Sequence, residues 1–397
     1  MDRRIPLPRA VIALGAVSLF TDLSSEMIYP LLPVFLVGVL GASAVSLGLV
    51  EGVAEATASL FKVASGFWSD RVGRRKPLVV AGYGLSGFAR PFIGLAWAWP
   101  VVLGLRFADR VGKGLRTSPR DALIADVTDP AIRGRAYGWH RAMDHAGAVL
   151  GPLAAAGLLA VGLELGEVFL LAAVPALVVM AILVFAVKET RPTARPHQSP
   201  VGDLGQLGPA YRRLLLAVLV FTLGNSADAF LLLRLSHAGV APAIVAVLWS
   251  AHHVVKMIAT AAGGRSCDRW GPKRGVVVGW VLYAAVYLAF GVVDSEWGLI
   301  ALFLAYGLYF GAAEPAERAW VAALVPERMR GLGFGGYHGA VGLGALPASL
   351  LFGWLWSGYG VAFAFSVGAA LALLAALMLL SVPESQPRAD VSTAQTG

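Results

Sequence analysis

Charged residues and cysteines are both scarce in this chain of 397 residues. Only 14% of the residues are charged, whereas soluble domains carry about 25%. The single cysteine, Cys267, cannot form an internal disulfide. We recognise no phosphate-binding loop, no zinc-ligand spacing and no Ser-His-Asp arrangement. These absences exclude a disulfide framework and argue against direct use of ATP, against an enzyme, and against a bound metal or other cofactor.

Apolar residues, in contrast, make up 57% of the chain and recur in stretches of about 20 residues, each long enough to cross a bilayer. We therefore predict an all-α membrane protein whose main partner is the lipid bilayer. The predicted transmembrane helices number twelve and lie at 10–38, 46–69, 77–97, 99–124, 136–161, 166–187, 212–236, 242–265, 274–292, 297–323, 333–356 and 360–382.

The Lys and Arg residues lie in alternate loops between these stretches. They occur at Arg3 and Arg4, Arg71–Lys76, Arg133 and Arg135, Lys273 and Arg274, and Arg328 and Arg330. This bias predicts that both termini are cytoplasmic. It also accounts for the net charge of +8 without a nucleic-acid partner. We expect a multi-pass protein of a bacterial inner (plasma) membrane.

The two halves of the chain repeat a sequence motif. The run Gly66-Phe-Trp-Ser-Asp70-Arg71-Val-Gly73-Arg-Arg75-Lys76 has a counterpart at Gly264–Arg274, which contains Asp268 and Arg269. Repeats of this size indicate two similar units around a central cavity. We predict two pseudo-symmetric six-helix bundles, 1–187 and 212–397, joined by a polar cytoplasmic linker at 188–211.

The Gly66–Lys76 run resembles the signature loop of the major facilitator superfamily, and the helix count, the termini and the linker agree with that family. The resemblance implies a fold of two bundles that rock about a central site. It also implies a conformational latch. The latch residues are Gly66, Asp70, Arg71, Gly73, Arg75, Asp268 and Arg269.

A second motif lies in the fifth predicted helix. Gly138, Gly147, Gly151 and Pro152 resemble the antiporter motif of this family, although Ala155 and Ala156 replace its last two glycines. The resemblance implies a transporter that exports its substrate in exchange for protons.

Charges within the predicted spans are costly, at roughly 2.5–3.5 kcal/mol each, and such residues must face a cavity or pair with one another. Asp22 and Glu26 lie on one face of the first helix, and Asp144 lies in the fifth. Because burial disfavours the charged form of a carboxyl, we predict that these three residues exchange protons. The predicted substrate-binding residues are Arg106, Asp109, Arg110, Arg141, Asn225 and Asp228.

Other interpretations stay open. The buried charges could form fixed salt bridges, and a symporter that imports an organic anion or metal chelate would need the same residues. His140 and His145, or His252 and His253, could bind a transported metal. A receptor or scaffold would gain nothing from buried charge. We therefore expect a monomeric, proton-coupled exporter of a small organic molecule.

Overall fold

The computed structural model describes residues 6–72, 75–129, 132–187, 207–326 and 329–384, and the regular structure in these ranges is helical. The first half of the chain contains α1 (Arg9–Glu26), η1 (Tyr29–Leu31), α2 (Leu32–Val34), η2 (Phe35–Val39), α3 (Ala44–Val72), α4 (Lys76–Ala89), η3 (Pro91–Leu95), α5 (Trp99–Asp126), α6 (Arg133–Ala160), α7 (Leu165–Leu171) and α8 (Ala173–Phe185). The second half contains α9 (Pro209–Gly224), α10 (Ala229–His237), α11 (Pro242–Trp270), α12 (Pro272–Val292), α13 (Glu296–Leu324), α14 (Arg330–Tyr359) and α15 (Val361–Leu380).

Eleven helical stretches of the described residues are long and apolar enough to cross a membrane. The expected span at 99–124 is the helix α5, which has the necessary length of 28 residues but carries too many charges to qualify by composition. Its charged residues Arg106, Asp109 and Arg116 are buried, since α5 packs against α3 and α4. The chain is therefore an all-helical, multi-pass membrane protein.

Two of the expected spans are interrupted. The span at 10–38 is bent after α1, where Pro30 and Pro33 remove backbone donors and the chain continues as η1, α2 and η2. The span at 212–236 consists of α9 and α10, which are separated by residues 225–228. In addition, α9 begins at Pro209 and not at 212, because proline suits the first turn of a helix.

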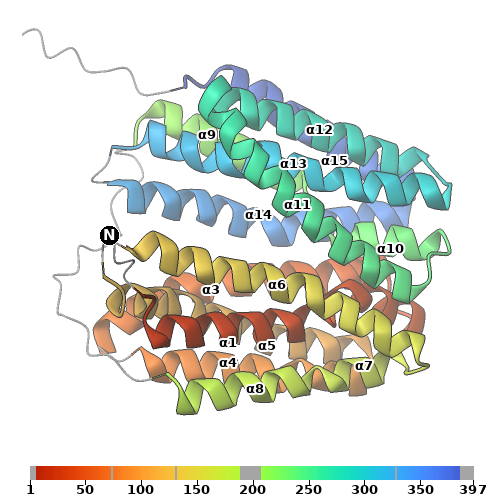
Figure 1. The fold of residues 1–397 in the computed structure, drawn as a ribbon. Helices are drawn as coiled ribbons and strands as arrows, with labels where there is room; N and C mark the ends of the chain where they lie inside the picture. Colours follow the sequence, from red (N-terminus) through yellow and green to blue (C-terminus); the bar gives the residue numbers. More distant parts are fainter. Residues whose placement is uncertain (1–5, 73–74, 130–131, 188–206, 327–328, 385–397) are drawn as a thin grey trace, which may run out of the picture.

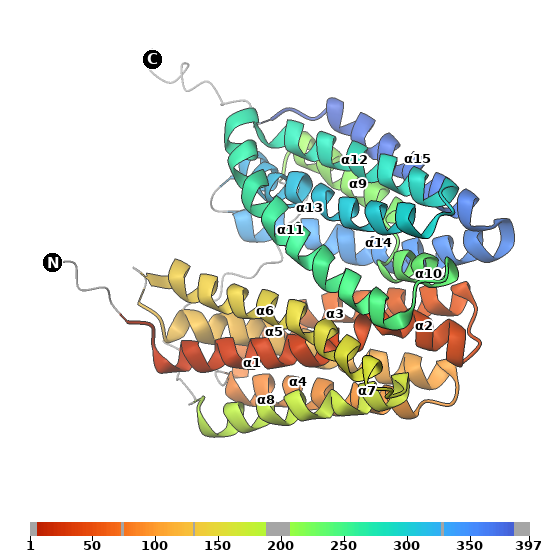
Figure 2. The same ribbon diagram turned by 45° about the vertical axis from the view of Figure 1, so that its right-hand side comes forward.

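The helices form two groups, which Figure 1 shows one above the other. Helices α1 to α8 make up the lower group and α9 to α15 the upper group. The groups contact each other mainly through α3 with α14 and through α6 with α11. Figure 2 shows that α6 and α11 diverge toward the end of the molecule at which α1 begins and α15 ends.

Glycines bring α3 and α14 together at the opposite end. A Cβ atom on Gly48 would lie 2.2 Å from the Ser349 carbonyl oxygen, and one on Gly353 would lie 2.5 Å from the Ala44 oxygen. Toward the termini, Gly335 and Gly339 of α14 have no atom within 4 Å of such a position. The two halves are thus in close contact at one end and separate toward the other.

Candidate functional site

A cavity of about 460 Å³ lies between the two halves and is lined by residues of both. Its charged lining residues are Asp22, Glu26, Glu51, Glu55, Arg90, Arg106, Arg110, Lys113, Arg116, Arg141, Asp144, Asp228 and Lys256. Of the nine residues predicted to exchange protons or to bind substrate, seven are in this list. Two others are not, because Asp109 is buried behind the wall and Asn225 lines a second cavity in the C-terminal half.

An ion-pair network holds α3, α4 and α5 together along one wall. Arg106 Nη2 donates to both oxygens of Glu51, at 2.6 and 2.8 Å. Arg90 Nε lies 2.6 Å from Asp109 Oδ1, and Arg106 Nη1 lies 3.6 Å from Asp109 Oδ2. These four side chains are at most 6% exposed. In this structure Arg106 and Asp109 therefore hold the helices together through ion pairs, while Arg106 Nε is buried without a hydrogen-bond partner.

Because these charges are buried and paired, removing one of them should strongly lower the stability of the protein. Replacing Glu51 with Gln removes the closer of the two carboxylates that pair with Arg106 and leaves its buried guanidinium with only the 3.6 Å contact to Asp109, which we expect to lower the free energy of unfolding by about 3–5 kcal/mol. The double variant Glu51→Gln/Arg106→Gln should lose less, because no charge is left unpaired. Unfolding experiments in detergent measure the free energy of unfolding of both variants. Glu314→Gln breaks the more exposed Arg318–Glu314 pair and should cost no more than about 1 kcal/mol. Equal losses in all three variants would contradict this role.

Two further cations on α5, Arg110 and Lys113, line the cavity. Arg110 Nε has no hydrogen-bond partner and is 3.7 Å from Asp109 Oδ2. Lys113, one helical turn further along, has no carboxylate within 4 Å among the described residues and is exposed to the cavity. The neighbouring Arg116 is already held, since it donates to Ser86 and lies 4.4 Å from the centre of the Tyr83 ring. Arg110 and Lys113 thus form a cationic face of the cavity.

Carboxyl groups of α1 and α6 also line the cavity. Ser18 Oγ donates to Asp144 Oδ1, while Arg141 Nη1 and His140 Nδ1 each lie 3.5 Å from Asp144 Oδ2. The Asp144 side chain is 15% exposed and, like Asp22, lines the cavity. Together with Glu26 of α1, three carboxyl groups of these two helices therefore line the cavity.

The glycines of α6 explain why these carboxyls lie close together. A Cβ atom on Gly147 would meet the Leu19 oxygen at 2.4 Å and the Asp22 Cβ at 2.9 Å. One on Gly151 would meet the Leu23 oxygen at 2.6 Å and the Glu26 Cβ at 3.0 Å. The two glycines therefore allow α6 to pack directly beside the two acidic residues of α1. By contrast, Gly138 has open space around it, and Pro152 is buried within α6.

Side chains of the C-terminal half complete the cavity. Trp249 Nε1 of α11 donates to Glu26 Oε2 at 2.8 Å, which connects the two halves. Tyr306 OH donates to Asp228 Oδ1 at 2.7 Å. Trp249 could not be selected from the sequence, because nothing near it along the chain indicates a contact with Glu26. Lys113 is also missing from the residues predicted to bind substrate, although it lines the cavity.

The latch positions are only partly covered by the described residues. Arg75 Nε lies 3.2 Å from Asp126 Oδ2 at the end of α5, and Arg269 is exposed in the last turn of α11. The other positions lie outside the part of the chain whose side chains are described, namely Gly66, Asp70, Arg71, Gly73 and Asp268.

None of the histidines in the described ranges belongs to a cluster that could hold a metal ion. The described residues contain no group of three or more His, Cys, Asp or Glu side chains that could hold a metal ion. His252 is 1% exposed, and its ring stacks on Tyr306 with centroids 5.4 Å apart. Its position is that of a residue packed among aromatic rings.

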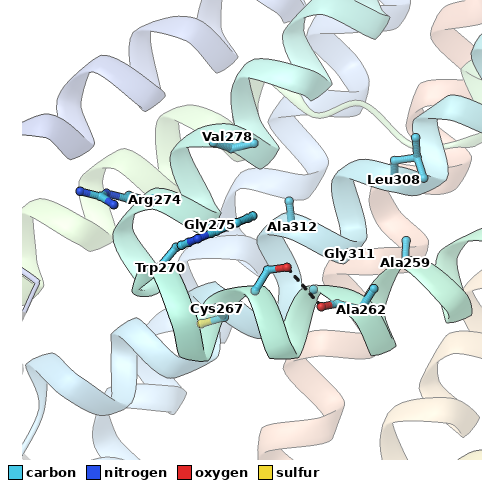
Figure 3. Close-up of a pocket in the computed structure, with 12 residues that line it drawn as sticks. Ala259, Ala262, Cys267, Trp270, Arg274, Gly275, Val278, Leu308, Gly311 and Ala312 are labelled. Atoms are coloured by element: carbon cyan, nitrogen blue, oxygen red, sulfur yellow. Dashed lines mark hydrogen bonds between the residues drawn. The ribbon is translucent and has the colours of Figure 1, made fainter.

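A larger hollow of about 540 Å³ lies away from these charges, between α11, α12 and α13. Figure 3 shows that its lining consists mostly of small and apolar side chains, with Arg274 at one side. Trp270 and Val278 of this lining are more than half exposed, at 57% and 61%. An apolar surface of this kind faces lipid tails in a membrane protein and is not a site for a polar substrate.

Comparisons with known proteins agree with this arrangement. The sequence profile of the Major Facilitator Superfamily matches residues 14–236 and 214–397. An uncharacterised MFS-type transporter of Methanocaldococcus jannaschii is 32% identical over 386 residues, which cover 95% of both chains. The multidrug resistance protein MdtH of Photorhabdus laumondii is 27% identical and covers 85% of this chain and 84% of its own. The crystal structure of a bacterial homolog of the human lysosomal transporter Spinster, inward-facing and unoccupied, has a TM-score of 0.72 at 18% identity, covering 94% of both chains.

Proposed function

The chain belongs to the Major Facilitator Superfamily, and on this premise we propose that it exports a small organic molecule in exchange for protons. This family consists of transporters and is not an enzyme class. The observation that carries the proposal is the cavity between the halves, which is lined both by the cations Arg110 and Lys113 and by the carboxyl groups of Asp22 and Asp144. Export is supported by the similarity to a multidrug resistance protein and by the glycines that bring α6 against α1.

The proposed topology has twelve spans, with α5 as the fourth, and both termini in the cytoplasm. Its support is the alternation of Lys and Arg between loops, together with the burial of the α5 charges against α3 and α4. The two bundles would be joined by a linker that begins at 188 and ends where α9 begins, at Pro209 and not at the expected 212. We place the protein in a bacterial plasma membrane as a monomer, with the end that carries the termini facing the cytoplasm.

The proposed coupling follows from the cost of burying charge. When the cavity closes, charged Asp22, Glu26 and Asp144 lose contact with water, which is unfavourable. A bound proton removes this cost in one half of the cycle, and contacts with the substrate remove it in the other half. Arg110 and Arg141 would hold a polar or acidic group of the substrate. The latch around Asp70 and Asp268 would stabilise one of the two orientations.

A second candidate is a symporter that imports an organic anion or metal chelate. Lys113 and Lys256 both line the cavity without a carboxylate within 4 Å in the described part of the chain. An acidic substrate held by these cations would lie near Asp22 and Asp144 and would favour their protonation. Substrate and proton would then bind together, which is the requirement for symport.

Transport into inside-out vesicles with an acidic lumen distinguishes the two candidates. We expect gradient-dependent accumulation of one component of a pooled library of antibiotics, organic acids and metal chelates, detected by mass spectrometry. Arg110→Gln should reduce that accumulation at least tenfold, because it removes a cation that faces the cavity. Arg212→Gln changes an exposed arginine outside the cavity and should not. If the compound accumulates only in right-side-out vesicles, the protein is an importer and the proposal of export is wrong.

A further inference from the structure

The C-terminal half contains a second cavity of about 250 Å³, between α9, α11, α12, α13 and α14. Aromatic rings form much of its wall, from Phe221, Trp280, Tyr309, Phe310 and Tyr337. Trp280 and Phe221 are stacked, with ring centroids 4.3 Å apart and an angle of 8° between the planes. Aromatic faces of this kind attract cations, because the faces carry partial negative charge.

A carboxylate without a cationic partner lies in this aromatic wall. Trp280 Nε1 donates to Glu317 Oε1 at 2.8 Å, and Tyr337 OH donates to Glu317 Oε2. Because an indole N–H can only donate, the oxygen that faces it must accept. No Lys or Arg nitrogen among the described residues lies within 4 Å of Glu317, whereas the neighbouring Glu314 is paired with Arg318 at 2.7 Å. Glu317 is thus held in place by neutral donors and has no basic partner among the described residues.

The cavity already holds one ammonium group on an aromatic face. Lys256 Nζ lies 3.6 Å from the centroid of the Phe310 ring and has no carboxylate within 4 Å in the described ranges. Lys256 also lines the main cavity, where Asp228 and the α5 cations lie. It is therefore the side chain through which the two cavities adjoin, and its flexible stem can place the ammonium group in either of them.

We propose that the second cavity is a subsite for the protonated amine of an organic substrate. The amine would bind between Glu317 and the aromatic wall, and Lys256 would turn toward the main cavity, where it could meet an acidic group of the same molecule. The role of this subsite in transport rests on the proposed export function, to which it adds the chemical class of the substrate. A positively charged substrate favours the release of protons from nearby carboxyls, which is the linkage that exchange requires.

The proposal predicts that substitutions of two residues in the second cavity change the affinity for an amine in opposite directions. Glu317→Gln removes the attracting charge and should weaken amine binding at least tenfold. Lys256→Met removes the competing ammonium but keeps a similar apolar stem, and it should tighten amine binding severalfold. A role of both residues in packing alone would not produce opposite effects on a cationic ligand.

Isothermal titration calorimetry on the purified full-length protein in detergent tests this directly. The probe is phenethylammonium, and its neutral counterpart of similar shape is 2-phenylethanol. We expect phenethylammonium to bind the wild-type protein at least tenfold more tightly than 2-phenylethanol does. Glu167→Gln is the matched control, because Glu167 is exposed and Gln can still complete the capping box at the start of α7.

Three results would overturn the proposal: equal binding of the amine and the alcohol, unchanged amine binding in Glu317→Gln, or weaker amine binding in Lys256→Met. If Glu317→Gln does not fold, the Lys256→Met measurement still decides the question. The binding experiment uses no pH gradient. Failure of proton-coupled export would therefore leave amine binding intact, and failure of the amine subsite would leave gradient-driven transport intact.

Discussion

We expect the Asp144→Asn protein to fold normally and yet to lose gradient-driven accumulation, down to the level of vesicles without the transporter. Asparagine keeps the shape of the side chain and an oxygen that accepts the hydrogen bond from Ser18. It cannot take up and release a proton. Because Asp144 lines the cavity and faces Arg141 at 3.5 Å, this change removes the exchangeable proton without removing the packing of α1 against α6.

The measurement compares accumulation in inside-out vesicles with an acidic lumen, after matching the amount of folded protein by thermal unfolding. Asp294→Asn is the control, because Asp294 also pairs with an arginine, Arg234, but its side chain is 91% exposed. This control should transport like the wild-type protein. If Asp144→Asn retains gradient-driven transport, Asp144 is not a proton carrier, and Asp22 and Glu26 become the candidates to test.

The main features of the fold could be predicted from the sequence because the bilayer requires them. Each crossing needs about 20 apolar residues, so the stretches and the repeated Gly66 and Gly264 motifs indicated the helices and the two halves. The exact helix ends were less predictable. The break at 225–228 and the bend after α1 depend on how these segments pack against other helices.

The candidate site could be predicted only as a set of residues. Helical spacing indicated that Asp22 and Glu26 share a face, but it could not identify the helix opposite that face. The pair of Arg106 and Glu51 joins residues 55 positions apart, and the contact of Trp249 with Glu26 joins residues 223 apart. Contacts over such separations follow from the packing of helices in three dimensions, which no local pattern encodes. The glycines Gly147 and Gly151 were selected by resemblance, and the structure supplies their physical role beside Asp22 and Glu26.

Disturbing the contact between α3 and α14 should strongly change the conformation of the protein. We expect Gly353→Val to shift the protein away from the conformation described here. A Cβ at position 353 would lie 2.5 Å from the Ala44 oxygen and 3.0 Å from the Val45 Cα. Backbone atoms cannot turn aside as a side chain can, so α14 must move away from α3. Overpacking of this kind costs about 1–3 kcal/mol, which corresponds to a population shift of roughly 5- to 150-fold.

Because this contact closes one end of the molecule, its loss should favour the opposite orientation, in which the halves approach each other at the end that carries the termini. Spin labels on cysteines at Phe185 and Leu380, both exposed at that end, should report shorter distances in Gly353→Val than in the parent protein, with Cys267 replaced by Ser in both. Gly358→Val is the control, since Gly358 also lies in α14 but has no atom within 4 Å of the added Cβ. An unchanged distance in Gly353→Val would mean that the α3–α14 contact does not control which end of the cavity is open.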